Sequence, residues 1–234
     1  MIEKEPIDYL VIDFDKTLIR ENLLIEWVLF LLFQSNFDFK ERMTFLLKSI
    51  CRGLTSFLLS QFSCFSERAV EIAYGNFRNV RTKSIHELIY EKSKWKKGFA
   101  INLNTDLLEI LQKILIVIRP GTSSRPKIII TSQGSFALAI RIFLERQDVV
   151  EHMKSAGISV DTSRKDHIIA NRLEAIDDRF TGLAIPPVVT KHNRFASFPP
   201  NALFVGDGKD EYALKRMGKT DVTFINYKKI AASD

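Results

Sequence analysis

Two aspartates that follow an apolar run are the residues of this sequence best placed to do chemistry. Residues 9–12 are apolar and are predicted to form a buried strand; Asp13 and Asp15 come directly after it, and Thr17 lies four residues beyond Asp13. Carboxylates at the end of a buried strand are costly unless a cation or a reaction needs them there. In an open α/β sheet, ligands bind at the carboxyl ends of the strands. The spacing therefore predicts metal-assisted chemistry with an aspartate nucleophile.

A second apolar run ends in hydroxyl side chains. Residues 128–130 are isoleucines, and Thr131 and Ser132 follow them ahead of a predicted helix. A hydroxyl followed by backbone amides at the start of a helix is well suited to bind a phosphate. We therefore expect Thr131 to bind phosphate oxygens, with Ser132 as the neighbouring rival donor.

Two later apolar runs end in charged residues. Lys191 follows one of them and is placed to hold a phosphate oxygen. Asp207 follows the other on a glycine-rich turn that also carries Asp210 and Glu211. At neighbouring strand ends, Asp13 and Asp207 would supply the hard oxygen ligands that Mg²⁺ prefers. We expect Asp210 and Glu211 behind these ligands, and partly as the N-terminal cap of the next helix.

Apolar periodicity predicts an α/β fold. Strands alternate with helices in the C-terminal half, which implies a Rossmann-like, mainly parallel sheet. Between the first strand and the rest of the sheet, residues 23–111 read almost entirely as helix. The expected organisation is an α/β core of residues 1–18 and 106–234, with an inserted helical cap of residues 19–105. The later strands are expected at 127–131, 167–174, 179–182, 202–206 and 222–227, with helices at 135–146 and 210–216.

The cap segment carries several apolar faces and both cysteines. Residues 43–50 and 54–62 each predict an apolar helical face. Cys51 and Cys64 have no Cys or His at ligand spacing, so we expect reduced, mostly buried thiols. Aromatic side chains are expected mainly in the core of the cap, namely Trp27, Phe30, Phe33, Phe37, Phe39 and Phe45.

Positive charge is concentrated in the same segment. The chain has a net charge of +6, and residues 19–105 contain 13 Lys and Arg against 8 Asp and Glu. A basic region favours anionic partners, although a solvated basic face explains it equally well. No recognition motif accompanies the charge, so no nucleic-acid partner is expected. With no secretory signal and no apolar run of membrane-spanning length, we expect a cytoplasmic protein with the option of peripheral membrane contact.

The order of these motifs resembles that of the haloacid dehalogenase-like (HAD) superfamily of phosphohydrolases. The resemblance covers the chain from Tyr9 to Tyr227, and the segment inserted after the first motif is similar to the helical C1 cap. Residues 167–174, with residues 179–182, resemble the hairpin of the phosphoserine-phosphatase-like branch. The four motifs that carry the resemblance are Asp13-Phe14-Asp15-Lys16-Thr17, then Thr131, Lys191, and Gly206-Asp207 with Asp210 or Glu211.

This resemblance implies a magnesium-dependent phosphatase that acts through an aspartyl-phosphate. Asp13 is then the nucleophile, and Asp15 protonates the leaving oxygen and later deprotonates the attacking water. Mg²⁺ is then held by Asp13, Asp207 and the backbone carbonyl of Asp15. Thr131 and Lys191 are then the ligands of the phosphoryl oxygens.

The cap bears on the choice of substrate. Phosphoserine phosphatases carry a glutamate nine residues after the nucleophile, where this chain has Asn22, with Glu21 one position earlier. A substrate other than free phosphoserine is therefore expected. The apolar, basic cap favours a lipid-like or other amphipathic phosphomonoester. The alternative is a non-catalytic module of the same fold that docks on a membrane or a partner through its cap.

Overall fold

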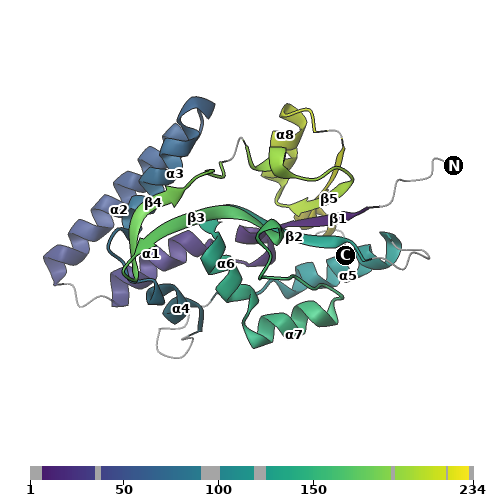
Figure 1. Cartoon of the computed structure of the whole chain (residues 1–234), viewed down its shortest axis with the longest axis horizontal. Helices are drawn as coiled ribbons and strands as arrows, with labels where there is room; N and C mark the ends of the chain where they lie inside the picture. The colour runs from purple at the N-terminus through teal and green to yellow at the C-terminus, as the bar shows by residue number, and fades with distance from the viewer. Residues whose placement is uncertain are drawn as a thin grey trace.

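The computed structural model describes residues 7–34, 38–90, 101–118, 125–190, 193–219 and 221–231. In this part of the chain one six-stranded sheet has the order β4-β3-β2-β1-β5-β6 (Figure 1). Neighbouring strands are parallel except β3 and β4, which form an antiparallel hairpin. The strands are β1 (Tyr9–Asp13), β2 (Lys127–Phe136), β3 (Ile168–Ile176), β4 (Arg179–Ile185), β5 (Ala202–Gly206) and β6 (Val222–Asn226).

β1 lies in the middle of the sheet, and its side chains alternate between two cores. Leu10 and Ile12 belong to the larger apolar cluster, whereas Val11 packs into a smaller cluster with Phe195 and Phe204. Alternation follows from the two-residue period of a strand, and burial on both faces explains the uninterrupted apolar run. The mainly parallel sheet with its helices confirms the predicted α/β fold class.

Helices connect β1 to β2 throughout the described part of this segment: α1 (Leu23–Gln34), α2 (Phe39–Leu59), α3 (Ser66–Tyr74), α4 (Lys83–Tyr90) and α5 (Thr105–Ile118). Those later in the chain are α6 (Ala137–Leu144), α7 (Gln147–Ser155), α8 (Gly208–Arg216) and α9 (Tyr227–Ala231). The largely helical segment agrees with expectation. Helix α7 was not predicted, because it turns only two apolar side chains, Val149 and Met153, towards the core and its apolar periodicity is therefore weak. The division into core and cap domains stays a prediction.

An aromatic cluster joins the helical segment to the sheet. Trp27 of α1 stacks on Phe77, with 3.9 Å between ring centroids, and meets Phe180 of β4 edge-on at 5.4 Å. It also lies 5.1 Å from Phe136 of β2. The indole nitrogen of Trp27 donates a hydrogen bond of 3.1 Å to Ser84 of α4, which satisfies its one polar group. The predicted burial of Trp27 is confirmed.

The segment after α1 differs from expectation. One 21-residue helix, α2, carries most of both predicted apolar faces, and a capping box between Asp38 and Glu41 starts it. Most of its apolar side chains are exposed instead of forming the core of the cap, and Phe39 is 82% exposed. Cys51 and Cys64 are likewise exposed, so the prediction of mostly buried thiols is wrong. The apolar side chains of α2 and the two cysteines were expected to be buried because of their residue types. Burial, however, depends on which face of a helix meets a neighbour. Phe37 lies outside the described residues.

No helix in the described ranges is both long and apolar enough to cross a membrane.

Candidate active site

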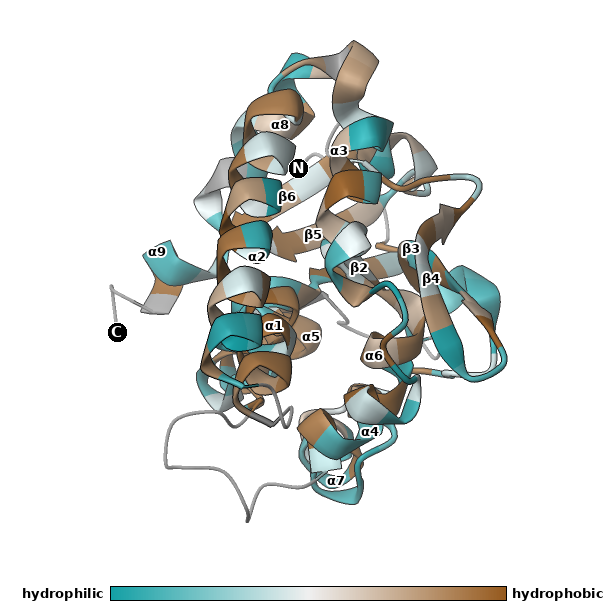
Figure 2. Ribbon diagram, turned by 90° about the vertical axis from the view of Figure 1, so that its left-hand side faces the viewer, coloured by the Kyte–Doolittle hydropathy of each residue, from teal (hydrophilic) through white to brown (hydrophobic). Residues whose placement is uncertain are grey.

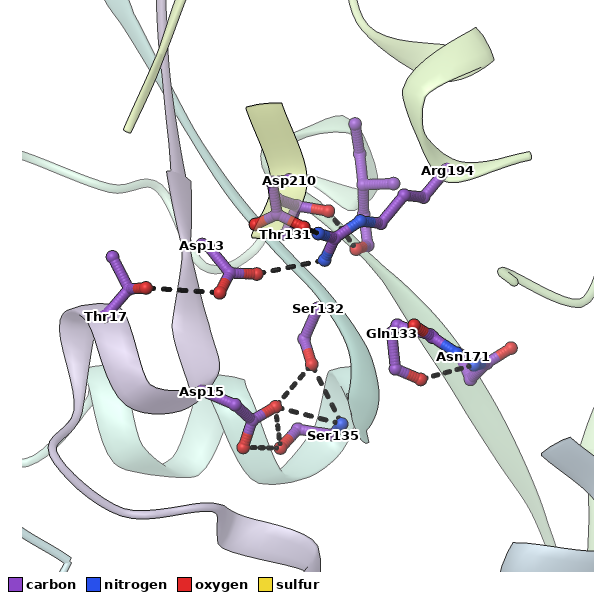
Figure 3. Close-up of polar contacts among 11 residues, drawn as sticks. Asp13, Asp15, Thr17, Thr131, Ser132, Gln133, Ser135, Asn171, Arg194 and Asp210 are labelled. Carbon is purple, nitrogen blue, oxygen red and sulfur yellow. Dashed lines mark hydrogen bonds and ion pairs between the residues drawn. The ribbon is translucent and has the colours of Figure 1, made fainter. Parts of the chain in front are cut away.

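Three parallel strands bring the predicted residues to one edge of the sheet (Figure 3). Asp13 is the last residue of β1 and lies opposite Thr131 of β2 in the strand register. On the other side of β1, β5 ends at Gly206, and Asp207 follows it directly. The carboxyl ends of β1, β2 and β5 therefore meet, as expected for a ligand site in an open α/β sheet.

Asp13 is buried and has a hydrogen-bond partner on each carboxylate oxygen. Thr17 donates its hydroxyl to Oδ2 at 3.2 Å, across the tight turn of residues 14–18 that follows β1. Arg194 donates from Nη1 to Oδ1 at 3.0 Å. Burial raises the pKa of Asp13 to about 8; Arg194 opposes this shift, while the charges of Asp210 and Asp15 add to it.

Arg194 joins two of the predicted acids. It begins a short 3₁₀ turn, residues 194–197, and its guanidinium forms ion pairs with both Asp13 and Asp210 while remaining buried. The guanidinium also lies over the rings of Phe195 and Phe204, at 4.7 Å and 5.9 Å from their centroids. A planar cation thus connects the end of β1 to the first turn of α8.

Gly206 leaves the room that this contact needs. A Cβ atom at Gly206 would stand 2.8 Å from Oδ2 of Asp210 and 3.1 Å from the ring of Phe204. Because neither neighbour can move without disturbing Arg194 or the core, only glycine fits at the end of β5.

Asp15 is held by donors from both sides of the site. The backbone amide of Leu23, the first residue of α1, donates to Oδ1 at 2.9 Å. Ser132 donates its hydroxyl to Oδ2 at 2.6 Å. The Ser135 hydroxyl lies 2.8 Å from both oxygens, and its amide donates to Oδ2 at 3.3 Å. Asp15 therefore ties the start of the helical segment to the end of β2.

The two predicted phosphate ligands on β2 point to different partners. The hydroxyl of Thr131 is fully buried and donates to the backbone carbonyl of Ile169 on β3, at 3.1 Å. Ser132 instead faces Asp15, after the pairing of β2 with β3 becomes irregular beyond Thr131. Of the two hydroxyls, that of Ser132 is bonded to a site side chain, whereas that of Thr131 is bonded to the sheet.

The acids of the glycine-rich turn also separate. Asp210 lies in the first turn of α8, where its amide donates to the carbonyl of Asp207, and its side chain reaches Arg194. Glu211, one residue later, pairs with Lys215 at 2.8 Å along the same helix. Its charge is thus used on the surface of α8, and the structure does not bring Glu211 to Asp13.

Comparisons with solved structures show the fold to which this site belongs. No known family model matches the sequence, and no curated protein matches it either. A phosphoserine phosphatase holding an analogue of its phospho-aspartyl intermediate aligns with 97% of this chain and 98% of its own, with a TM-score of 0.52 and 13% identity. The chain has a HAD-like, phosphoserine-phosphatase-like fold.

Two further structures have the same HAD-like fold. A phosphoserine phosphohydrolase-like protein from Francisella tularensis subsp. tularensis SCHU S4 gives a TM-score of 0.55 at 16% identity, over 94% of this chain and 86% of that one. A HAD family hydrolase from Salmonella enterica subsp. enterica serovar Typhi gives 0.52 at 13% identity, over 97% of this chain and 70% of that one. At such identities the likeness establishes the fold alone.

The segment that carries the third predicted motif differs from expectation. The apolar residues 187–189, which precede Thr190 and Lys191, suggest the end of a strand, but residues 186–190 lie outside every strand that the structure describes. Lys191, the predicted phosphate ligand, lies outside the described residues. The described cation at this position is Arg194, which our sequence reasoning missed. Its only signal was a basic residue three positions after Lys191 and directly before Phe195.

The oxygen donors of the site fit Mg²⁺ by type. Asp13 and Asp207 are carboxylates at neighbouring strand ends. Burial is the main cause that raises the pKa of the nearby Tyr227, and the charges of Asp207 and Asp13 raise it further. Among the described residues, no group of three His, Cys, Asp or Glu side chains converges to hold an ion. A Mg²⁺ ion at Asp13 and Asp207 would therefore also need backbone oxygens or substrate oxygens, which this cation commonly uses.

Proposed function

We propose that this HAD-like chain is a Mg²⁺-dependent phosphomonoester hydrolase in which Asp13 is the nucleophile. The observation that carries the proposal is the buried carboxylate of Asp13 at the end of β1, held between Thr17 and Arg194. An orienting hydroxyl and a fixed guanidinium leave this acid little freedom, as nucleophilic catalysis requires. The phosphoserine phosphatases and the HAD hydrolase that share the fold support a phosphatase of this general class.

The proposed reaction has two displacements at phosphorus. An oxygen of Asp13 bonds to phosphorus while the bond to the leaving oxygen breaks, which gives an aspartyl-phosphate, and Asp15 gives its proton to the leaving oxygen. Asp15 then takes a proton from a water molecule whose oxygen attacks phosphorus, releasing phosphate and restoring the Asp13 carboxylate. The solved phosphoserine phosphatase with a phospho-aspartyl analogue supports this order.

The serines around Asp15 suit a group that must gain and lose a proton. Ser132 and Ser135 both offer hydroxyl hydrogens to the carboxylate. A hydroxyl can rotate and accept a hydrogen bond instead of donating one. The same two side chains can therefore bind Asp15 in its charged and its protonated form without moving the backbone.

Asp13, Asp207 and the backbone carbonyl of Asp15 are our candidates to hold Mg²⁺, which when bound would offset negative charge on the phosphoryl group. Burial leaves the pKa of Asp13 at about 8 even with Arg194 beside it. A further positive charge would favour the anionic, nucleophilic form of this carboxylate. We keep Thr131, Ser132 and Lys191 as proposed ligands of the phosphoryl oxygens, and add Arg194 to them.

The substrate that we propose is a bulky or amphipathic phosphomonoester in place of free phosphoserine. The two side chains nearest the position of the amine-binding glutamate are both engaged elsewhere. Glu21 accepts two hydrogen bonds of 2.9 Å from Asn102, and Asn22 accepts one of 3.1 Å from the amide of Ile25, which caps α1. Both side chains therefore serve structural contacts, and the position of the amine-binding glutamate itself holds Asn22, which has no charge to bind an ammonium.

The test is turnover of an aryl phosphate, with Mg²⁺ and with a chelator. We expect hydrolysis that chelation abolishes and added Mg²⁺ restores. Turnover indifferent to the chelator would refute the metal role. Complete inactivity over a panel of phosphomonoesters would instead favour the rival function, a non-catalytic module that docks through its cap. The exposed apolar side chains of α2 are the observation in favour of that rival.

A further inference from the structure

The outer face of α2 is the largest group of exposed apolar side chains on one helix among the described residues. This helix lies on the side of the molecule that faces the viewer in Figure 2, where apolar and polar residues alternate along it. Seven of its large hydrophobic side chains are between 39% and 82% exposed, and Phe62 and Phe65 are also exposed just beyond its end. We call these residues the α2 stripe: Phe39, Met43, Leu47, Ile50, Leu54, Phe57, Leu58, Phe62 and Phe65.

α2 packs on the rest of the chain through a more polar face. Ser49 is the one buried residue of the helix, and its hydroxyl has no hydrogen-bond partner among the described residues. Arg52 also turns inward, where it donates to the carbonyl of Gly75 at 2.7 Å and to the side chain of Asn76 at 3.3 Å. The folded chain therefore leaves the more apolar face of α2 outside. A contiguous apolar surface of this kind marks an interaction site.

The spacing of the α2 stripe is that of a helix that pairs with another helix. Met43, Leu47, Ile50, Leu54 and Phe57 are separated by four, three, four and three residues, the alternation of a heptad seam. A helix that lies along a membrane surface instead carries rows of Lys and Arg beside its apolar face. The positions that flank this seam within the helix are Thr44, Leu46, Cys51, Gly53 and Leu58, none of which is charged.

Gly53 adds an independent indication of a close neighbour. A glycine in the interior of a helix weakens the helix, so its presence calls for a reason. No atom of the described residues lies within 4 Å of a Cβ built at Gly53, so packing within this part of the chain does not require it. Beside the seam, the missing side chain would let a second helix backbone approach closely.

We propose that the α2 stripe is the interface of a homodimer, in which the same stripe of a second copy covers it. A symmetric dimer uses one self-complementary patch on both subunits, which matches an apolar seam without charges to select another partner. Since an aromatic side chain carries roughly 150–250 Å² of surface, the four exposed phenylalanines alone offer roughly 500 Å². With the aliphatic side chains added, the exposed apolar area of the stripe approaches the area that each subunit buries in a stable interface, about 800 Å².

The experiment compares the full chain with two paired variants by sedimentation velocity. Wild type should sediment with twice the 26.9 kDa mass of one chain, and Leu47→Glu with Leu54→Glu should sediment as a monomer. The matched control is Ile116→Glu with Val117→Glu, because both residues are exposed apolar side chains on α5, away from the stripe. This control should remain a dimer. The melting temperature of wild type, but not of the α2 variant, should rise with protein concentration.

A second pair of substitutions tests the same interface with a different charge, and a vesicle assay tests whether the stripe binds a membrane instead. Met43→Lys with Ile50→Lys should also give a folded monomer, with the helical circular dichroism of wild type. A dimer that survives both α2 variants, or a wild type that is monomeric throughout the micromolar range, would overturn the proposal. So would a monomeric wild type that co-sediments with phosphatidylserine-containing vesicles, because the stripe would then be a membrane contact.

Discussion

Arg194 donates a hydrogen bond of 3.0 Å to Asp13 although 181 residues separate them in the chain. The same guanidinium pairs with Asp210, so one buried cation holds the end of β1 and the first turn of α8 in a fixed relation. Breaking a buried ion pair by removing one partner leaves an uncompensated charge, which is far more costly than the loss of a surface pair. Arg194 is therefore expected to matter for stability as well as for activity.

Arg194→Met should lower the free energy of unfolding by about 3–5 kcal/mol, because Asp210, and Asp13 in its charged form, would then lack the buried cation. Urea unfolding measures the change, and turnover of an aryl phosphate should be lost in the same variant. Arg194→Lys should recover part of the stability but little of the turnover, since an ammonium cannot bridge two carboxylates as a planar guanidinium does.

The matched control for this prediction is Arg194→Met combined with Asp210→Asn. Removing one of the two acids reduces the repulsion, so the double variant should be more stable than Arg194→Met alone. If both are equally stable, the ion pair with Asp210 contributes nothing, and Arg194 acts through Asp13 and its ring contacts with Phe195 and Phe204.

Asp13→Asn should remove turnover while making the metal-free protein more stable at alkaline pH. The folded-state pKa of Asp13 is raised to about 8 from an ordinary value near 3.8. Between these values the folded protein keeps a proton that the unfolded chain has lost, so this carboxyl makes stability fall as pH rises from about 4 to 8. Asparagine does not titrate, and the fall should become shallower.

Melting temperatures of both proteins in chelator, taken from pH 5 to pH 8.5, provide this measurement. Identical slopes would mean that Asp13 is not shifted in the folded state. Wild-type turnover in Asp13→Asn would show that the nucleophile is misassigned, whatever the slopes.

The strand ends of this site were predictable because each combines two strong local signals. A buried run of Val, Ile and Leu identifies a strand, and a polar residue directly after it can only lie at the sheet edge. Asp13, Thr131 and Asp207 were found in this way. The parallel register then brings Asp13 opposite Thr131 without further information.

Arg194 and Ser135 could not be found by that reasoning. Each reaches the site from an irregular segment, a 3₁₀ turn in one case and the disrupted end of β2 in the other. No period of apolar residues indicates where such side chains point. The exposed face of α2 was misjudged for a related reason, since periodicity shows that a helix is amphipathic but not which face meets the protein.

Asp15→Asn should lower turnover by about 10²–10⁴-fold, the usual contribution of a positioned general acid. The loss should depend on the leaving group: small for p-nitrophenyl phosphate, whose phenolate leaves without a proton, and large for an alkyl phosphate. Comparing kcat/KM for the two substrates in wild type and variant gives the result, because kcat/KM reports only the steps up to formation of the aspartyl-phosphate, before Asp15 acts as a base on water. An equal loss on both would mean that Asp15 orders the site and does not protonate the leaving oxygen.

Ser135→Ala should cause a smaller loss with the same dependence on leaving group. Its hydroxyl contacts both oxygens of Asp15, so its removal loosens the acid without removing it. Ser163→Ala serves as the control, since this serine bonds Asp161, an exposed carboxylate remote in sequence from the motifs. A Ser135→Ala variant with wild-type kinetics on both substrates would assign the positioning of Asp15 to Ser132 and Leu23.

The last prediction concerns the substrate and the charge of the helical segment. Residues 19–105 carry 13 basic against 8 acidic side chains, and the remainder of the chain is close to neutral. If this charge faces the entrance of the site, it raises the encounter rate with anionic substrates. The effect should weaken with added salt, because the Debye length is only about 8–10 Å at 0.1–0.15 M.

We therefore expect a higher kcat/KM for an amphipathic phosphomonoester than for phosphoserine, and a fall of both values between low and moderate salt. The preference follows from Asn22, which has no charge to bind an ammonium, and from Glu21, which Asn102 already contacts through both carboxylate oxygens. A clear preference for phosphoserine would mean that one of them exchanges its structural contact for the substrate ammonium. Equal rates at both salt concentrations would mean that the basic side chains form a solvated face, because a field that steers substrate cannot be insensitive to its own screening.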